Sequence, residues 1–209
     1  MKRTTKELTE RMLKKSVIKN TDPDFNEICE EVENTRRLVC ELNNSPHTDD
    51  EARKLLEEIW GQKLDSSVRV FPPFYTAFGK LTKIGKNVFI NFGCTFLDQG
   101  SITIEDDVFI APCVKITTEA HPENPEGRHN LLIKPVVIKQ NAWIGANAVM
   151  LVHGQNAHSR YFSEDAFKKL KGENKKLLIV PNANHTDLYD NLEKIPFDEI
   201  ENFIRTNLK

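Results

Sequence analysis

The chain has 209 residues, of which 39% are hydrophobic and 29% are charged, with a formal net charge of −2 at pH 7. This is the composition of a globular protein with one sizeable core or two small ones. The small net charge gives no global attraction to nucleic acid or to an anionic membrane, so neither is expected as a partner.

The first sixteen residues, MKRTTKELTERMLKKS, are too charged for a signal peptide, and no apolar run reaches the length of a membrane span. The four cysteines form no CxxC pair, and the six histidines are scattered. We therefore expect a cytoplasmic protein with reduced thiols and no metal site.

Residues 1–62 are predicted to be helical. Thr21-Asp22-Pro23-Asp24 offers a capping side chain and a proline suited to a first helical turn. The apolar residues that follow share one helical face, and Asn43-Asn44-Ser45-Pro46 should end that helix. A second helix should begin at the capping box of Thr48 and Glu51 and end at Gly61.

Residues 63–151 change from a helical period to a repeat of six. Six hexads each start with isoleucine and carry a small or β-branched residue at the fifth position, beginning at Ile84, Ile90, Ile104, Ile110, Ile138 and Ile144. This period predicts a coil of three short flat strands per turn, with each isoleucine inside a narrow triangular prism and the fifth residue near a corner. The alternative is a sandwich of ordinary short strands, which six hexads in register make improbable.

This segment resembles the hexapeptide-repeat acyltransferase superfamily and, within it, the maltose/galactoside O-acetyltransferase family. The resemblance is carried by the hexads and by three further stretches: Val70-Phe71-Pro72-Pro73-Phe74-Tyr75, Asn91 to Asp98, and Thr117 to Pro122 with Arg128. It covers residues 1 to about 150. It implies a left-handed parallel β-helix, a homotrimer, and acetyl transfer from acetyl-CoA to a hydroxyl of a sugar.

By this resemblance His121 is the general base. A hydroxyl is a poor nucleophile at neutral pH, and histidine titrates in the range that suits its activation. His121 also lies beside Pro122 in a polar excursion without apolar periodicity, where a core histidine is not expected. Without the hexads around it, a loop histidine with no chemistry would be the better interpretation.

The resemblance also assigns binding residues. Asn91, Asp98 and Arg128 are expected at the sugar acceptor, although Asn and Asp serve equally well in tight corners. Ala77 stands where some relatives carry a small hydroxyl residue, which leaves the acceptor open. Trp143 and the backbone amide of Ala146 are expected near the thioester of CoA, where an N–H would stabilise an oxyanion. Trp143 could equally pack between subunits.

Residues 152–209 follow a different pattern, since the hexads end after Ala148. A helix at 163–172, an apolar strand at 176–180 and an amphipathic helix at 197–208 follow a strand at 149–154. This order resembles the end of an α/β-hydrolase, with His185 in the place of its catalytic histidine. The chain has no G-x-S-x-G elbow to supply the nucleophile, so hydrolase activity is not expected.

We therefore interpret the chain as a chimera, joined near Val149–Val152, where both parents would have an apolar strand. The loss of later coils removes much of the surface that binds CoA in the family and predicts weak or absent binding of acetyl-CoA. Two alternatives remain open: a folded but inactive β-helix, and a hydrolase remnant using His185.

Overall fold

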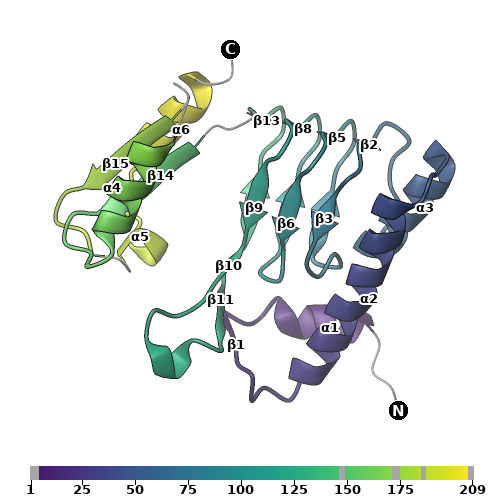
Figure 1. Cartoon of the computed structure of the whole chain (residues 1–209), viewed down its shortest axis with the longest axis horizontal. Helices are drawn as coiled ribbons and strands as arrows, with labels where there is room; N and C mark the ends of the chain where they lie inside the picture. The colour runs from purple at the N-terminus through teal and green to yellow at the C-terminus, as the bar shows by residue number, and fades with distance from the viewer. Residues whose placement is uncertain (1–4, 146–148, 171–174, 185–186, 207–209) are drawn as a thin grey trace. The chain divides into compact units, whose positions relative to one another are not determined.

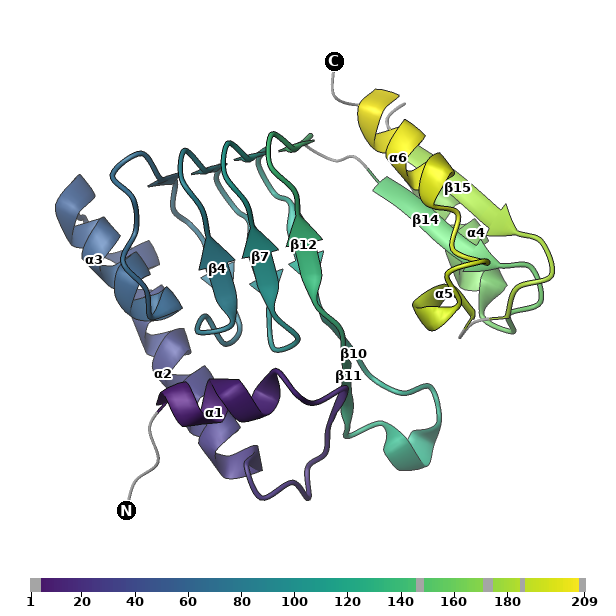
Figure 2. The ribbon, with the colours of Figure 1, turned by 180° about the vertical axis from the view of Figure 1, so that it is seen from behind.

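A computed structural model describes residues 5–145, 149–170, 175–184 and 187–206. The chain forms two compact units, Met1–Trp143 and Ile144–Lys209, which are treated separately below (Figures 1 and 2). In the described residues, no helix is both long and apolar enough to cross a membrane.

The first unit begins with three helices: α1 (Thr5–Met12), α2 (Phe25–Asn44) and α3 (Asp49–Trp60). The predicted capping box is confirmed, because Thr48 Oγ1 accepts from the N–H of Glu51 at 3.3 Å and Glu51 Oε2 accepts from the N–H of Thr48 at 2.8 Å. The helix then ends at Gly61 in a left-handed conformation, as predicted.

The start of α2 differs from the expected cap. Asp24 occupies the N-cap position, but its side chain makes no capping hydrogen bond. The carboxylate is buried and accepts from Arg11 Nε at 2.9 Å, with Lys15 Nζ at 3.5 Å. An ion pair with the preceding segment has therefore replaced the local cap.

A two-residue strand, β1 (Val17–Ile18), interrupts the segment that was predicted to be helical. It pairs antiparallel with β11 (Leu131–Ile133), so a partner far along the sequence overrides local preference. An apolar cluster holds the two together with the first coil: Leu8, Met12, Ile18, Ile28, Phe78, Leu81 and Ile133.

The hexad region is a three-sided parallel β-helix, as the repeat predicted (Figures 1 and 2). One side consists of β2 (Arg69–Val70), β5 (Phe89–Ile90), β8 (Phe109–Ile110) and β13 (Trp143–Ile144). The second consists of β3 (Tyr75–Thr76), β6 (Thr95–Leu97) and β9 (Lys115–Thr117). The third consists of β4 (Thr82–Ile84), β7 (Ile102–Ile104) and β12 (Val136–Ile138).

The isoleucines of the hexads stack in register inside this prism. Ile90 pairs with Ile110, and Ile104 lies between Ile84 and Ile138, with Ile90, Ile104, Ile110 and Ile138 all buried. No predicted hexad starts on the second side, where Phe96 pairs with Ile116 and both side chains are buried.

The fourth residue of each described hexad explains why Asn, Asp and Gly recur there. Each turns a corner at positive φ: Asn87, Gly93, Asp107, Cys113 and Asn141. This left-handed backbone disfavours most side chains but tolerates Gly, Asn and Asp. The corners also bond to one another, since Asn87 Nδ2 donates to Asp107 Oδ1 at 2.9 Å.

The third coil is broken by an excursion between β9 and β12. It contains β10 (Glu119–Ala120), a short 3-10 helix (Pro125–Gly127) and β11. Its two strands pair antiparallel, and β1 covers the other edge of β11. The excursion is therefore held by the N-terminal segment as well as by the coil.

The second unit contains two parallel strands, β14 (Val149–Gly154) and β15 (Lys175–Val180). Three helices accompany them: α4 (Arg160–Lys169), α5 (Asp187–Asp190) and α6 (Phe197–Thr206). The predicted order of strand, helix, strand and helix is present. The unit begins at Ile144. Among the described strands, β14 pairs with β15 and with no strand of the coil.

Candidate active site

His121 lies on the excursion directly after β10, and its side chain is exposed. Its Nδ1 lies 2.7 Å from the carbonyl oxygen of Arg128 and 3.1 Å from that of Asn130. A carbonyl oxygen can only accept, so Nδ1 carries the proton in these contacts. In the neutral ring Nε2 then has a free lone pair, which is the state that a general base requires.

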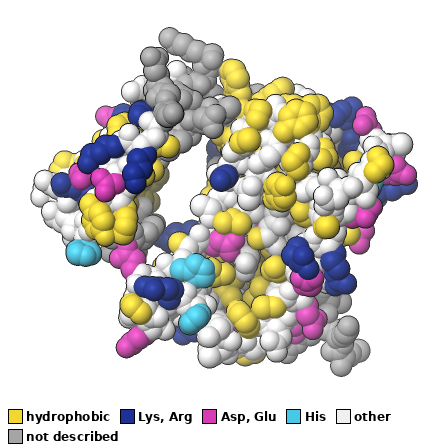
Figure 3. Space-filling model, in the orientation of Figure 1, with side chains coloured by type: hydrophobic (Ala, Val, Ile, Leu, Met, Phe, Trp, Pro, Cys, Tyr) yellow, Lys and Arg dark blue, Asp and Glu magenta, His cyan; other side chains and the backbone are white. Residues whose placement is uncertain are grey.

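The loop geometry explains how this ring is held. The N–H groups of Gly127 and Asn130 donate to the carbonyls of Asn124 and Gly127, which folds the excursion back on itself. The carbonyls of Arg128 and Asn130 thereby converge on one imidazole nitrogen. Figure 3 shows histidine side chains on the surface of this excursion.

Glu119, two residues before His121, was not among the predicted site residues. Its Oε2 is buried and has no hydrogen-bond partner among the residues that the structure describes. Burial and the nearby charge of Asp98 raise the pKa of Glu119 to about 7, and His121 opposes this shift. The one signal in the sequence that could have indicated Glu119 was its acidic side chain two residues before the predicted base.

Asp98 lies inside the coil, with no exposed surface in this chain. Its oxygens accept from the N–H groups of Phe78 at 2.8 Å and Gly79 at 2.9 Å, and from the Thr82 hydroxyl at 2.7 Å. Burial raises its pKa, and these hydrogen bonds oppose the shift. These contacts give Asp98 the corner role that its residue type allowed, and its expected role at the acceptor stays a prediction.

The other two predicted acceptor residues lie apart from each other. Asn91 precedes β6 and its Oδ1 accepts from the N–H of Phe92 at 2.8 Å, whereas Asp98 follows β6 at its other end. Arg128 is exposed beside His121, and its guanidinium donates to the carbonyl of Glu123 at 3.3 Å. Within one chain, Arg128 therefore lies beside His121, whereas Asn91 lies in the corner between β5 and β6.

Trp143 lies on the outer face of the last coil and is 46% exposed. It belongs to an aromatic face defined by Phe71, Phe89, Phe92, Phe109 and Trp143. Figure 3 shows hydrophobic side chains gathered over this part of the coils. Ala146, the other residue expected at CoA, lies outside the described residues.

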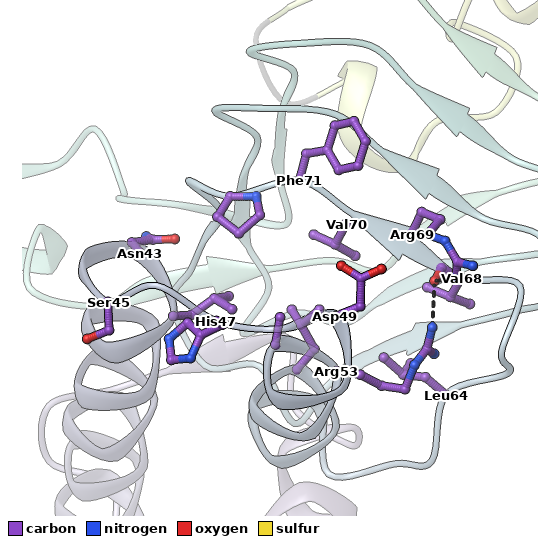
Figure 4. A pocket seen from close by; sticks show the side chains of 14 residues that line it. Asn43, Ser45, His47, Asp49, Arg53, Leu64, Val68, Arg69, Val70 and Phe71 are labelled. Carbon is purple, nitrogen blue, oxygen red and sulfur yellow. Dashed lines mark hydrogen bonds between the residues drawn. The ribbon is translucent and has the colours of Figure 1, made fainter.

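A cavity of about 460 Å³ lies between the first coil and the ends of α2 and α3 (Figure 4). Arg53, one of its lining residues, donates to the carbonyl of Val68 at 3.1 Å, so this charge has a protein partner. None of the predicted site residues lines the cavity. It gives no support to a reaction at that place.

In the second unit, His185 lies outside the described residues. His153, at the end of β14, contacts two serines: Ser159 Oγ lies 3.3 Å from Nε2 and Ser163 Oγ lies 3.0 Å from Nδ1. Both ring nitrogens are thus engaged with hydroxyls of α4 and its N-cap. These contacts explain why Ser159 makes no capping bond to the helix.

No family model matches the chain. It is 36% identical over 140 residues to a putative acetyltransferase of Saccharomyces cerevisiae, covering 66% of this chain and 69% of the relative. The chain belongs to the maltose/galactoside O-acetyltransferase family of hexapeptide-repeat acyltransferases. Two further relatives match over shorter stretches.

Galactoside O-acetyltransferase of Escherichia coli is 33% identical over 132 residues, which cover 60% of this chain and 65% of the relative. Nodulation protein L of Rhizobium leguminosarum is 40% identical over 99 residues, which cover 46% of this chain and 51% of the relative. The match therefore spans about half to two thirds of the length of these two curated relatives.

Solved structures agree. A maltose O-acetyltransferase from Clostridium difficile has a TM-score of 0.61 at 25% identity, covering 84% of this chain and 90% of that chain. A hexapeptide-repeat acetyltransferase from Vibrio cholerae, complexed with acetyl coenzyme A, has a TM-score of 0.58 at 26% identity, covering 84% and 93%.

A different similarity covers a shorter stretch of this acetyltransferase-family chain. An uncharacterized protein of Pseudomonas aeruginosa is 52% identical over 65 residues, which make up 31% of this chain and 17% of that protein. The chain therefore shares sequence with acetyltransferases and, over a short stretch, with a much longer protein.

Proposed function

We propose that the chain transfers the acetyl group of acetyl-CoA to a hydroxyl of a sugar or a similar small acceptor, with His121 as general base. The observation that carries the proposal is the imidazole whose Nδ1 is occupied by two carbonyls, which leaves Nε2 for the acceptor. Acetyl-CoA supplies a thioester carbonyl that is open to attack by the activated oxygen.

In this mechanism Nε2 of His121 accepts the proton of the acceptor hydroxyl as that oxygen attacks the acetyl carbonyl. The C–S bond of the thioester then breaks, and the imidazolium returns the proton to the leaving sulfur, so that CoA departs as the thiol and His121 is again neutral. Nδ1–H keeps its hydrogen bonds to the carbonyls of Arg128 and Asn130 throughout, so the ring holds its orientation while it carries the positive charge. The exposed guanidinium of Arg128 is close enough to contact an acceptor in the same loop region.

The surface around Trp143 suits part of acetyl-CoA. The exposed ring of Trp143 on the last coil offers an apolar surface for the pantetheine arm. The neighbouring strand on the same side of the coil carries Phe109, which is also exposed. Among the described residues, β14 pairs with β15, and this pairing supports the expectation that the family's later coils are missing. We therefore expect acetyl-CoA to bind weakly.

Calorimetry with acetyl-CoA tests the first half of the proposal, and release of CoA in the presence of acceptor sugars tests the second. His121→Ala should lower turnover by about 10²–10⁴-fold, the usual contribution of a general base. His129→Ala, an exposed histidine of the same excursion, is the matched control. Equal turnover of the wild type and His121→Ala would contradict the role of His121.

The complete site is proposed to lie between subunits of a homotrimer with left-handed coils. Two observations support this: Asn91 and His121 lie on separate parts of one chain, and the aromatic face is exposed, with Phe109 at 48%. Light scattering should give three times the chain mass of 24.0 kDa. A monomeric mass at micromolar concentration would overturn the shared site.

We also propose that the second unit derives from a different parent, joined to the coil near Val149–Val152. The parallel pair β14–β15 and the change from hexads to a helix–strand pattern support a fusion. Amplification of genomic DNA across codons 140–160 as one piece would support a natural fusion. Failure to amplify it would indicate an assembly error.

Two alternatives make different predictions. A catalytically inactive β-helix would keep β-rich circular dichroism but show no acetyl-CoA binding at millimolar ligand. A hydrolase remnant using His185 would cleave simple esters, and that cleavage would be lost in His185→Ala. The described residues offer His153 a serine on each ring nitrogen, and neither is placed on an elbow.

A further inference from the structure

The cavity of about 460 Å³ between the first coil and the ends of α2 and α3 takes no part in the proposed reaction (Figure 4). Its volume is that of a small-molecule site, which is typically about 300–1,000 Å³. Among its lining residues, Leu42, Leu56 and Val68 are buried, and Val70 and Pro72 are half-buried. The cavity therefore has an apolar side that can receive an apolar group of a ligand.

Hydrogen bonds from the two helices hold the walls of this cavity. At the end of α2, Asn43 Nδ2 donates to the carbonyl of Phe74 at 2.8 Å, and Asn43 Oδ1 accepts from the N–H of Phe74 at 2.9 Å. On α3, Arg53 donates from Nη1 to the carbonyl of Asp65 at 2.9 Å and from Nη2 to that of Ser66 at 3.3 Å. The walls are thus formed before a ligand arrives, which lowers the entropy cost of binding.

Arg69 brings a positive charge to the cavity from β2. Its backbone N–H donates to the carbonyl of Val88 at 2.9 Å, and its Nη1 donates to the carbonyls of Ser66 at 2.7 Å and Val68 at 3.1 Å. Its Nε and Nη2 have no hydrogen-bond partner in the described part of the chain. These two nitrogens form one edge of the planar guanidinium, the fork that binds both oxygens of a carboxylate.

Asp49 brings a negative charge to the same cavity from the first residue of α3, where the capping box of Thr48 and Glu51 fixes the helix start. Among the residues that the structure describes, its carboxylate forms no hydrogen bond or ion pair, with Arg69 or with another group. Figure 4 shows this carboxyl group pointing toward β2, the strand that carries Arg69. A single exposed charge is ordinarily solvated, but two unpaired charges of opposite sign beside one apolar cavity match a ligand that carries both charges.

We propose that this cavity binds a small zwitterion, an α-amino acid with an apolar side chain, without changing it chemically. The ligand's carboxylate accepts from Nε and Nη2 of Arg69, its ammonium group donates to the carboxylate of Asp49, and its side chain lies against Leu42 and Leu56. A simple anion would leave Asp49 unpaired, and a neutral ligand would bring no charge to either residue. The proposal does not depend on acetyl transfer, because His121 does not line the cavity.

The test is an NMR titration of the full chain, labelled at its backbone amides, with L-alanine, L-valine, L-leucine, L-methionine and L-phenylalanine in turn. We expect saturable shifts at the residues that line the cavity, with a dissociation constant on the order of 1 mM for the best of them. Two compounds then divide the charges of leucine: isocaproate lacks the ammonium group, and isoamylamine lacks the carboxylate. Each should bind about 10-fold more weakly than leucine, because one charged contact is lost.

Two variants assign the contacts. Asp49→Asn keeps the shape of the side chain and should weaken leucine about 3–30-fold while leaving isocaproate unchanged. Asp50→Asn is the matched control, because Asp50 is exposed in the same helical turn and does not line the cavity, and it should bind leucine like the wild type. Arg69→Lys keeps the charge but removes the fork, so it should weaken both leucine and isocaproate and leave isoamylamine unchanged.

Several results would overturn the proposal. One is the absence of saturable shifts with all five amino acids at about 50 mM, well above the expected dissociation constant. Another is a set of shifts that maps away from the cavity. If isocaproate binds as tightly as leucine, or if Asp50→Asn weakens leucine as much as Asp49→Asn, the site recognises an anion or the helix charge rather than a zwitterion. The comparison of leucine with its two analogues needs only the wild type, so it decides the matter even if a variant does not fold.

Discussion

The two units of the chain bury apolar side chains to different extents. In the coil, large residues such as Phe74, Phe96 and Ile102 have no exposed surface. In the described part of the second unit, the buried apolar residues are smaller: Ala157, Val180 and Ala183. No residue of α4 is buried.

This difference shows how each unit obtains stability. A repeating coil buries its apolar ladder against the coil above and the coil below, so it needs no other domain. Two parallel strands with helices need a larger sheet with both faces covered. The second unit therefore has the character of a part taken from a larger fold.

Limited proteolysis should separate the units most clearly. We expect a protease to digest the second unit first, because its few buried contacts allow local opening at low free energy. A resistant fragment should end near residues 144–149, and intact-mass measurement would identify that end. Equal resistance of both units, or a first cut within the coils, would remove the distinction.

Phe96→Ala should show the strength of the coil core. Phe96 has no exposed surface and stacks edge-on against Phe74, with ring centroids 5.0 Å apart. The change should lower the free energy of unfolding of the first unit by about 3–5 kcal/mol. Leu97→Ala, the next residue and 40% exposed, should cost under about 1 kcal/mol. Chemical denaturation followed by circular dichroism measures both.

Glu119→Gln should change stability in a pH-dependent way. The folded pKa of Glu119, about 7, is higher than its ordinary value of 4.5, so the folded state binds more protons between these pH values. Stability should therefore fall as pH rises from about 4.5 to 7. At pH 8 the glutamine variant should be more stable by about 1–2 kcal/mol, after allowance for solvent screening.

At pH 5 the two proteins should unfold almost alike, because Glu119 is then largely protonated in the folded state. Thermal unfolding at both pH values measures this difference. A stabilisation of the same size at pH 5 and pH 8 would show that burial of the carboxyl group does not depend on its ionisation.

Thr48→Ala should have the smallest effect, about 1 kcal/mol, the usual cost of losing an N-cap. The hydroxyl of Thr48 accepts the N–H of Glu51, and the alanine cannot replace it. Ser66→Ala offers a control on the surface of the same unit. A loss well above 2 kcal/mol would mean that α3 is coupled to the coil more tightly than its cap requires.

The sequence predicted a coil of three strands per turn and the capping box of α3, because both leave regular local patterns. The isoleucine hexads mark two of the sides, whereas the inward residues of the second side are Phe96 and Ile116. The strand β1 was missed, because its partner, β11, lies far along the chain and two residues carry no period.

The candidate site was predicted only in part. Family resemblance located His121, but nothing in the residue types showed that its Nδ1 would meet two carbonyls. Asp98 carries the same chemical groups whether it binds an acceptor or closes a corner, and only burial separates the two roles. The buried Oε2 of Glu119, which has no hydrogen-bond partner among the described residues, results from the packing of β10, and the residues next to Glu119 in the sequence could not have predicted it.

The pairing of β1 with β11 sets an order of events during synthesis. Each coil contacts the coil made just before it, so the prism can grow as the chain leaves the ribosome. Val17 can pair with Leu132 only after Leu132 has been translated, much later in synthesis. The loop that bears His121 is consequently closed only after residue 132 has been made, later than the first two coils.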